Sequence, residues 1–174
     1  IESFSTVKKE IFVPNDSHDL TYTDSEIKIS ENRNLMKTFI IAKMFDRCNF
    51  GQDDKVLIIG CLTGYSTAIL SKMVNYVVGI DNEKDIIDMA CKNIDKLNIL
   101  NCSIFYKKDL AQGLNRNAPY DKPPIPNTRA ACEDWTSEYS HQKSTWKQVG
   151  KHWTWPPICK VPPYQRQNHH GNAM

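Results

Sequence analysis

Residues Lys55–Tyr65 read KVLIIGCLTGY, and this stretch decides the fold class. Its first five residues form a short apolar run, which is typical of a parallel strand buried on both faces. Gly60 and Gly64 predict a tight turn at which the backbone can approach a ligand. The helix expected from about Ser66 to Met73 would present free backbone N–H groups at its N-terminus. The order strand, glycine turn, helix predicts the beginning of an α/β unit.

The segments on either side repeat this alternation. Tyr76–Ile80 (YVVGI) predicts a second buried strand, Glu83–Leu97 has apolar residues at helical spacing, and Ser103–Tyr106 predicts a third strand. Strand, helix, strand, helix, strand is the first half of a doubly wound α/β domain. Upstream, Asn34–Phe45 (NLMKTFIIAKMF) predicts an amphipathic helix. The apolar face expected for it consists of Leu35, Phe39, Ala42 and Phe45.

The chain changes character at Asp121. Residues 1–121 carry 15 basic and 17 acidic side chains, a net charge of −2, whereas residues 122–174 carry 7 and 3, a net charge of +4. The second part holds all four Trp and seven of the nine Pro, and it contains no Leu or Phe. It shows no helical or strand-like apolar period, and its prolines interrupt helices and ladders. We therefore predict a partial α/β domain over 1–121 and an irregular tail over 122–174.

The overall composition excludes several classes of protein. A net charge of +2 over 174 residues gives no reason to expect a nucleic-acid partner, and no run approaches the ~18 apolar residues of a membrane span. No spacing of His and Cys matches a metal site, so no metal is expected. The six cysteines form no C-x-x-C pair, and four lie in apolar segments. We expect free thiols and a reducing, cytoplasmic setting.

The glycine turn distinguishes between two kinds of cofactor. The dinucleotide pattern G-x-G-x-x-G would need glycine at positions 62 and 65, where this chain has Leu62 and Tyr65. Class I S-adenosylmethionine-dependent methyltransferases have G-x-G-x-G after the first strand. The chain matches that pattern at Gly60 and Gly64 and departs from it at Leu62, whose side chain is expected to narrow the loop. A plain strand-to-helix turn without a ligand is the alternative.

Two carboxylates follow the next strands. Asp81 ends the second strand, where it can accept hydrogen bonds from ribose hydroxyl groups; a helix N-cap is the alternative role. Asp109 follows the third strand and could accept a hydrogen bond from an adenine amino group; taken alone, it is better explained as a solvated turn residue. The set expected to bind a cofactor is Gly60, Cys61, Gly64, Tyr65, Asp81, Asn82, Asp109 and Leu110.

Five ordered segments together resemble the protein-L-isoaspartate O-methyltransferase family, a class I methyltransferase family. The resemblance covers about residues 4–121 and includes Tyr65 after the last glycine and the A-P-Y-D box. The matching segments are KKEIFVP (Lys8–Pro14), LTYTDSEIKI (Leu20–Ile29), FIIAKM (Phe39–Met44), VLIIGCLTGYSTAILSKM (Val56–Met73) and NAPYD (Asn117–Asp121).

The resemblance implies a Rossmann-like sheet of the class I methyltransferase type, of which this chain has the N-terminal half only. It implies methyl transfer from S-adenosylmethionine to the carboxylate of L-isoaspartyl residues in damaged proteins or peptides. The family's acceptor loop aligns with a stretch containing Arg33 and Asn34, which could pair with and donate to that carboxylate. Both could equally be solvated residues at a helix start. Ile58 replaces an acidic residue of the family's motif.

Two rival functions follow from these departures. The chain could methylate a small molecule or RNA, or it could be a truncated, non-catalytic remnant of the fold. A full member continues past Asp121 with further strands. Without them we expect the Lys55–Ile59 strand to lack a hydrogen-bonded neighbour on one edge, Val56–Ile59 to lose apolar cover, and the chain to have little or no activity.

Overall fold

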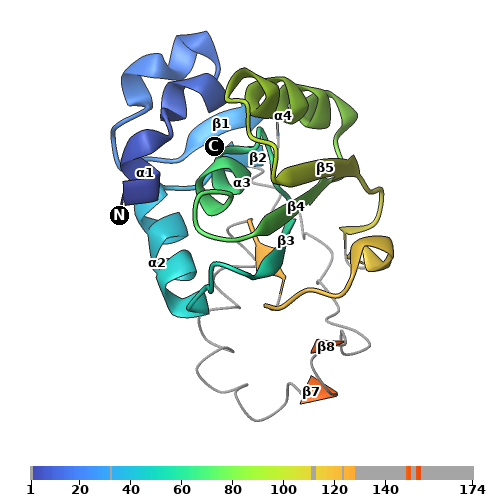
Figure 1. The fold of residues 1–174 in the computed structure, drawn as a ribbon. Coiled ribbons are helices and arrows are strands. Elements are labelled where there is room, and N and C mark those ends of the chain that lie inside the picture. The colour runs from blue at the N-terminus through green and yellow to red at the C-terminus, as the bar shows by residue number, and fades with distance from the viewer. Residues whose placement is uncertain are drawn as a thin grey trace, which may run out of the picture.

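The computed structural model describes residues 2–31, 33–110, 113–122, 124–127, 148–149 and 152–153. An N-terminal segment of short helices and a hairpin precedes the α/β part (Figure 1). The N-terminal elements are α1 (Glu2–Thr6), the 3₁₀ helices η1 (Lys9–Phe12) and η2 (Asn15–Leu20), and the antiparallel strands β1 (Ile27–Ser30) and β2 (Arg33–Leu35). The elements that follow are α2 (Thr38–Cys48), β3 (Lys55–Ile59), α3 (Tyr65–Leu70), β4 (Tyr76–Asp81), α4 (Lys84–Lys96), β5 (Cys102–Tyr106), the 3₁₀ helix η4 (Asn115–Asn117) and β6 (Ile125–Pro126).

The central sheet is parallel and has the order β5–β4–β3–β6. Lys55 of β3 lies opposite Tyr76 of β4, and Val77 of β4 lies opposite Cys102 of β5. The carboxyl ends of the strands therefore meet at one edge, which in open α/β sheets is the edge that binds ligands. The expected strand–helix–strand–helix–strand order is confirmed, and β3 has the predicted bounds.

β3 has a neighbour on its second side, so the expected unpaired edge is wrong. β6 pairs with it in parallel, and backbone hydrogen bonds hold both ends of this pairing. The Asp121 N–H donates to the Lys55 carbonyl over 2.9 Å, and the Asn127 N–H donates to the Ile59 carbonyl over 2.8 Å. The Lys55 N–H donates in turn to Asp121 Oδ2 over 2.8 Å. Four residues after the predicted boundary, the chain thus continues the sheet.

The expected loss of apolar cover on β3 is also wrong. Val56, Leu57 and Ile58 are at most 1% exposed, and Ile59 is partly buried. Successive side chains of a strand point to opposite faces. Val56 and Ile58 belong to the larger apolar cluster, which includes residues of α2, α3 and α4, and Leu57 belongs to a smaller cluster with Leu114 and Tyr120. The stretch between β5 and β6 therefore covers the face that the three helices leave open.

The helix predicted for Asn34–Phe45 is displaced toward the C-terminus. Its first residues form β2, and α2 begins at Thr38. Phe39, expected on the buried face, is 54% exposed. The buried residues of α2 are Ile41, Met44, Phe45 and Cys48, which follow the i, i+3, i+4, i+7 spacing of a helix face.

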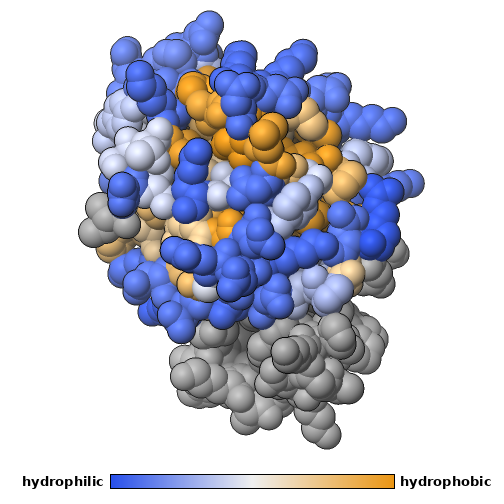
Figure 2. Space-filling view, in the orientation of Figure 1, coloured by the Kyte–Doolittle hydropathy of each residue, from blue (hydrophilic) through white to orange (hydrophobic). Residues whose placement is uncertain are grey.

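In the predicted tail the structure describes β6 and a small antiparallel pair, β7 (Gln148–Val149) with β8 (His152–Trp153). The other predictions for 128–174 fall outside the described residues, as do Cys132 and Cys159. On the face shown in Figure 2, hydrophobic residues gather around the position of α4, with hydrophilic residues on all sides. None of the described helices is both long enough and apolar enough to cross a bilayer.

The pairing of β6 with β3 can be tested through Ile125, which is 1% exposed. We expect Ile125→Ala to lower the free energy of unfolding by about 2–4 kcal/mol, because truncating a fully buried aliphatic side chain leaves a cavity. Urea denaturation followed by circular dichroism measures the change. Leu100→Ala is the matched control, because Leu100 is 91% exposed and its truncation should have little effect. Equal effects of the two substitutions would show that β6 does not pack on the sheet.

Candidate functional site

The turn after β3 is held by glycines in a left-handed backbone conformation. Gly60 has a φ of 76° and Gly64 has a φ of 93°, values that residues other than glycine rarely adopt. The N–H groups of Gly60 and Cys61 both donate to the Ile80 carbonyl, over 2.8 and 3.0 Å. The turn is thereby fixed against the end of β4, and α3 begins directly after Gly64.

Leu62 stands between these glycines and also has a positive φ, 50°. Its backbone N–H donates to Asp81 Oδ2 over 2.9 Å. Its side chain is 1% exposed and belongs to the larger apolar cluster. Burial of this side chain offsets the strain of a left-handed residue with a Cβ atom. That it narrows the loop for a ligand stays a prediction.

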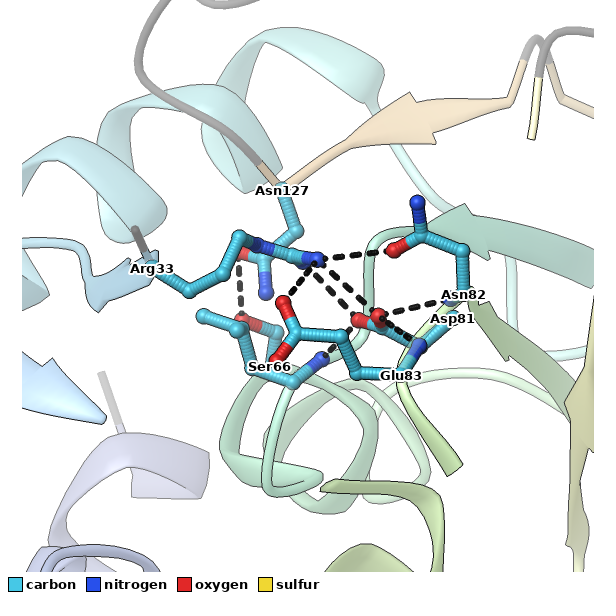
Figure 3. A network of polar contacts seen from close by, with 7 residues as sticks. Arg33, Ser66, Asp81, Asn82, Glu83 and Asn127 are labelled. Carbon is cyan, nitrogen blue, oxygen red and sulfur yellow. Dashed lines mark hydrogen bonds and ion pairs between the residues drawn. The ribbon is translucent and has the colours of Figure 1, made fainter. Parts of the chain in front are cut away.

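Asp81 is the only buried carboxylate among the residues that the structure describes, and it is 0% exposed. A buried charge is stable only when it is paired and hydrogen-bonded. Asp81 lies at the carboxyl end of β4 and receives backbone N–H groups from two directions (Figure 3). Leu62 donates to Oδ2, as described above, and Asn82 donates to Oδ1 over 2.7 Å.

The charge of Asp81 is balanced by Arg33, which comes from β2. Its two terminal nitrogens contact the two carboxylate oxygens, Nη1 to Oδ1 over 3.0 Å and Nη2 to Oδ2 over 2.9 Å. Nη1 also contacts Asn82 Oδ1 at 3.1 Å and Glu83 Oε1 at 3.5 Å (Figure 3). The sequence predicted that Arg33 pairs with a carboxylate of an acceptor. The carboxylate that it contacts in the structure is Asp81.

Asn34 does not share this location. Neighbouring residues of a strand point to opposite faces, so the side chain that follows Arg33 in β2 points away from the carboxylate. Asn34 is exposed and lies opposite Lys28 in the β1–β2 hairpin. The structure therefore brings Arg33, but not Asn34, to the end of β4.

The remaining predicted residues surround the turn at different depths. Cys61 is fully buried against Gly79, and burial raises the pKa of its thiol well above the usual value. Tyr65 packs on Phe12 with 5.5 Å between ring centroids, and burial raises the pKa of its hydroxyl. Asn82 is exposed beside Asp81.

Asp109 and Leu110 follow β5, whose end is joined to that of β4 by a 2.8 Å hydrogen bond from the Lys107 N–H to the Asp81 carbonyl. Asp109 is exposed, and Leu110 packs against the smaller apolar cluster. Both therefore lie near the carboxyl edge of the sheet, and that they bind a cofactor stays a prediction.

Sequence reasoning missed a buried polar pair behind the turn. The Ser66 hydroxyl donates to Asn127 Oδ1 over 3.0 Å, and both residues are 1% exposed. Among the residues that the structure describes, Asn127 Nδ2 has no hydrogen-bond partner. No local motif identified this pair, because Asn127 lies beyond Asp121 and reaches α3 only through the pairing of β6 with β3.

The geometry suits the binding of a nucleoside better than acid–base chemistry. A carboxylate at the end of the second strand, next to a glycine turn, can accept hydrogen bonds from ribose hydroxyl groups. The thiol beside it is buried and is held protonated by its raised pKa.

Comparison with known families gives a match over most of the chain. The model of the family described as protein-L-isoaspartate(D-aspartate) O-methyltransferase matches residues 1–134 of the 174. The match extends past Asp121 and includes β6, in agreement with the continued sheet.

Individual relatives and solved structures give the same picture. The chain is 31% identical over 138 residues to the protein-L-isoaspartate O-methyltransferase of Trichlorobacter lovleyi, covering 75% of this chain and 63% of that protein. A solved protein-L-isoaspartate O-methyltransferase superposes with a TM-score of 0.64 at 21% identity, covering 72% of this chain and 41% of the other. A Plasmodium falciparum protein described by the same activity, in complex with S-adenosyl-L-homocysteine, superposes with a TM-score of 0.57 at 19% identity, covering 69% and 61%. The chain thus spans about two fifths to two thirds of the length of these proteins.

Leu62 provides a test of the turn. We expect Leu62→Gly to lower the free energy of unfolding by about 1–3 kcal/mol, because the lost packing outweighs the relief of a left-handed backbone. The matched control is Asn98→Gly, at an exposed helix end that has the same φ of 50°. That substitution removes no buried side chain and should change stability by at most about 0.5 kcal/mol. Urea denaturation of both variants measures this, and a more stable Leu62→Gly protein would contradict the packing described here.

Proposed function

Because the chain belongs to the protein-L-isoaspartate(D-aspartate) O-methyltransferase family, we propose that it carries the cofactor site of an S-adenosylmethionine-dependent protein methyltransferase. The observation that supports this best is the buried Asp81 carboxylate at the end of β4, bonded to the backbone of the glycine turn. It stands where an open parallel sheet binds the ribose of a nucleoside ligand.

In this proposal each part of the site has a separate task. Asp81 accepts hydrogen bonds from the ribose hydroxyls, and the N–H groups of Leu62 and Asn82 hold its carboxylate in place. The turn from Gly60 to Gly64 brings backbone close to the ligand without intervening side chains at its two ends. Asp109 and Leu110 flank the adenine from the end of β5. Cys61 and Tyr65 support the turn from the protein interior.

We propose the carboxylate of L-isoaspartyl residues in damaged proteins as the acceptor, following the family's description. When bound, S-adenosylmethionine supplies a methyl group on a positively charged sulfur, which a carboxylate oxygen can take without a proton transfer. The protein then needs mainly to position the two reactants and exclude water. This agrees with a site that holds a fully hydrogen-bonded carboxylate and a protonated thiol.

The rival proposal of a non-catalytic remnant loses one of its two reasons. The expected unpaired, uncovered β3 is wrong, because β6 pairs with β3 and Val56–Ile58 are buried. The departures from the family's acceptor loop around Arg33 and Asn34 remain its other reason. A small-molecule or RNA acceptor is favoured by no contact among the described residues.

Binding of S-adenosyl-L-homocysteine tests the cofactor site directly. We expect Asp81→Ala to weaken binding by about tenfold or more, because the carboxylate that accepts from the ribose is lost. Isothermal titration calorimetry on the full chain measures the affinity. Asp85→Ala, which removes an exposed carboxylate from the first turn of α4, is the matched control and should bind as the parent does. Equal affinity of all three proteins would remove Asp81 from the site.

The acceptor is tested by transfer of a labelled methyl group to a peptide. We expect transfer to an isoaspartyl peptide and none to the peptide of the same sequence with a normal aspartyl residue. Transfer should fall in Asp81→Ala and persist in Asp85→Ala. Binding of S-adenosyl-L-homocysteine without transfer to the isoaspartyl peptide would overturn the proposed acceptor and leave the cofactor site standing.

A further inference from the structure

The carboxylate of Asp81 has no remaining capacity for a ligand while Arg33 is bound to it. A carboxylate oxygen accepts about two hydrogen bonds. Oδ1 accepts from Arg33 Nη1 and from the Asn82 N–H, with the Glu83 N–H at 3.4 Å, and Oδ2 accepts from Arg33 Nη2 and from the Leu62 N–H. Ribose hydroxyls can therefore donate to Asp81 only if one of these donors leaves the carboxylate.

Arg33 is the donor that can leave. The two close N–H groups belong to the turn and to the end of β4, which the hydrogen bonds of the sheet fix in place. Arg33 reaches the carboxylate by its side chain, from a separate hairpin, and that side chain is 16% exposed. Its torsions can turn without moving the sheet.

Asn82 and Glu83 provide a second set of hydrogen-bond acceptors for the Arg33 guanidinium. Nη1 is already 3.1 Å from Asn82 Oδ1 and 3.5 Å from Glu83 Oε1, and the Glu83 side chain is 39% exposed. Arg33 can therefore give up Asp81 and keep an anionic partner at the rim of the site. The charge that it balanced remains held by the N–H groups of Leu62 and Asn82.

We propose that Arg33 competes with the ribose hydroxyls of the cofactor for Asp81 and so sets the affinity and ligand preference of the site. This rests on the proposed cofactor site. Each ligand that brings a 2′,3′-diol to Asp81 must first break the paired contact with Arg33, which moves to Glu83. A ligand without these hydroxyls has no reason to displace it. Arg33 thus belongs to the cofactor site rather than to the acceptor site for which the sequence suggested it.

Replacing Arg33 tests this competition. We expect Arg33→Met to bind S-adenosyl-L-homocysteine about tenfold more tightly than the parent, a change of about 1.4 kcal/mol in binding free energy. Arg33→Lys should fall between the two, because a single ammonium cannot contact both carboxylate oxygens as the guanidinium does. In the Asp81→Ala background, Arg33→Met should give no gain, because nothing is left to compete for. All proteins comprise residues 1–174, and calorimetry measures their affinities.

The matched control is Arg47→Met, which removes an exposed arginine from the last turn of α2 and should leave the affinity unchanged. Adenosine and 2′,3′-dideoxyadenosine serve as a second pair of probes. Arg33→Met should tighten binding of adenosine and change that of the dideoxy analogue by less than about twofold, which a general loosening of the site would not produce.

Thermal unfolding shows which variants are folded. If Arg33→Met does not fold, the affinity of Arg33→Lys is compared with that of the parent instead. The inference is overturned if the parent binds S-adenosyl-L-homocysteine and the folded Arg33 variants bind it no more tightly. It is also overturned if the gain persists without Asp81. Failure of every protein to bind, controls included, would instead overturn the proposed cofactor site, so the two failures are distinguishable.

Discussion

The buried carboxylate of Asp81 connects three parts of the chain that are far apart in sequence. Its own strand, β4, supplies the charge, the glycine turn supplies the Leu62 N–H, and the β1–β2 hairpin supplies Arg33. A carboxylate without hydrogen-bond donors would be unstable in the interior, so in the ligand-free protein donors from these parts of the chain surround it. In the ligand-free protein Arg33 donates to both oxygens of Asp81, and these are the acceptor positions that the hydroxyls of a ribose would use in the proposed cofactor site.

The second constraint lies in β3. A central parallel strand must be hydrogen-bonded on both edges and covered on both faces, because buried peptide groups need hydrogen-bond partners and exposed aliphatic side chains are unfavourable in water. β4 and β6 satisfy the edges, and two separate apolar clusters satisfy the faces. A pairing as short as that of β6 suffices because the backbone bonds of Asp121 and Asn127 extend it at both ends.

These two constraints meet at the carboxyl edge of the sheet. Pairing of β6 places Asn127 beside Ser66 in the first turn of α3, directly behind the glycine turn whose other side contacts Asp81. Residues from both sides of β3 thereby surround its carboxyl end. The strand order of the sheet reverses there, between β3 and β6, and α/β proteins bind their ligands at such points. A site that binds and orients follows from this arrangement more readily than one that transfers protons.

Local sequence determined the strands and turns of the α/β part. The run KVLII, the glycines at 60 and 64 and the acid at 81 each act within a few residues, so period and residue type were enough to predict β3, its turn and the position of Asp81 at the end of β4. The helices α3 and α4 were predicted within a few residues of their ends. Only tertiary structure decided the rest. Ile125 pairs with β3 although prolines surround it, Arg33 lies in a strand rather than at a helix start, and its partner is 48 residues away. Contacts between distant segments depend on which surfaces remain uncovered once the sheet has formed, and no local pattern carries that information.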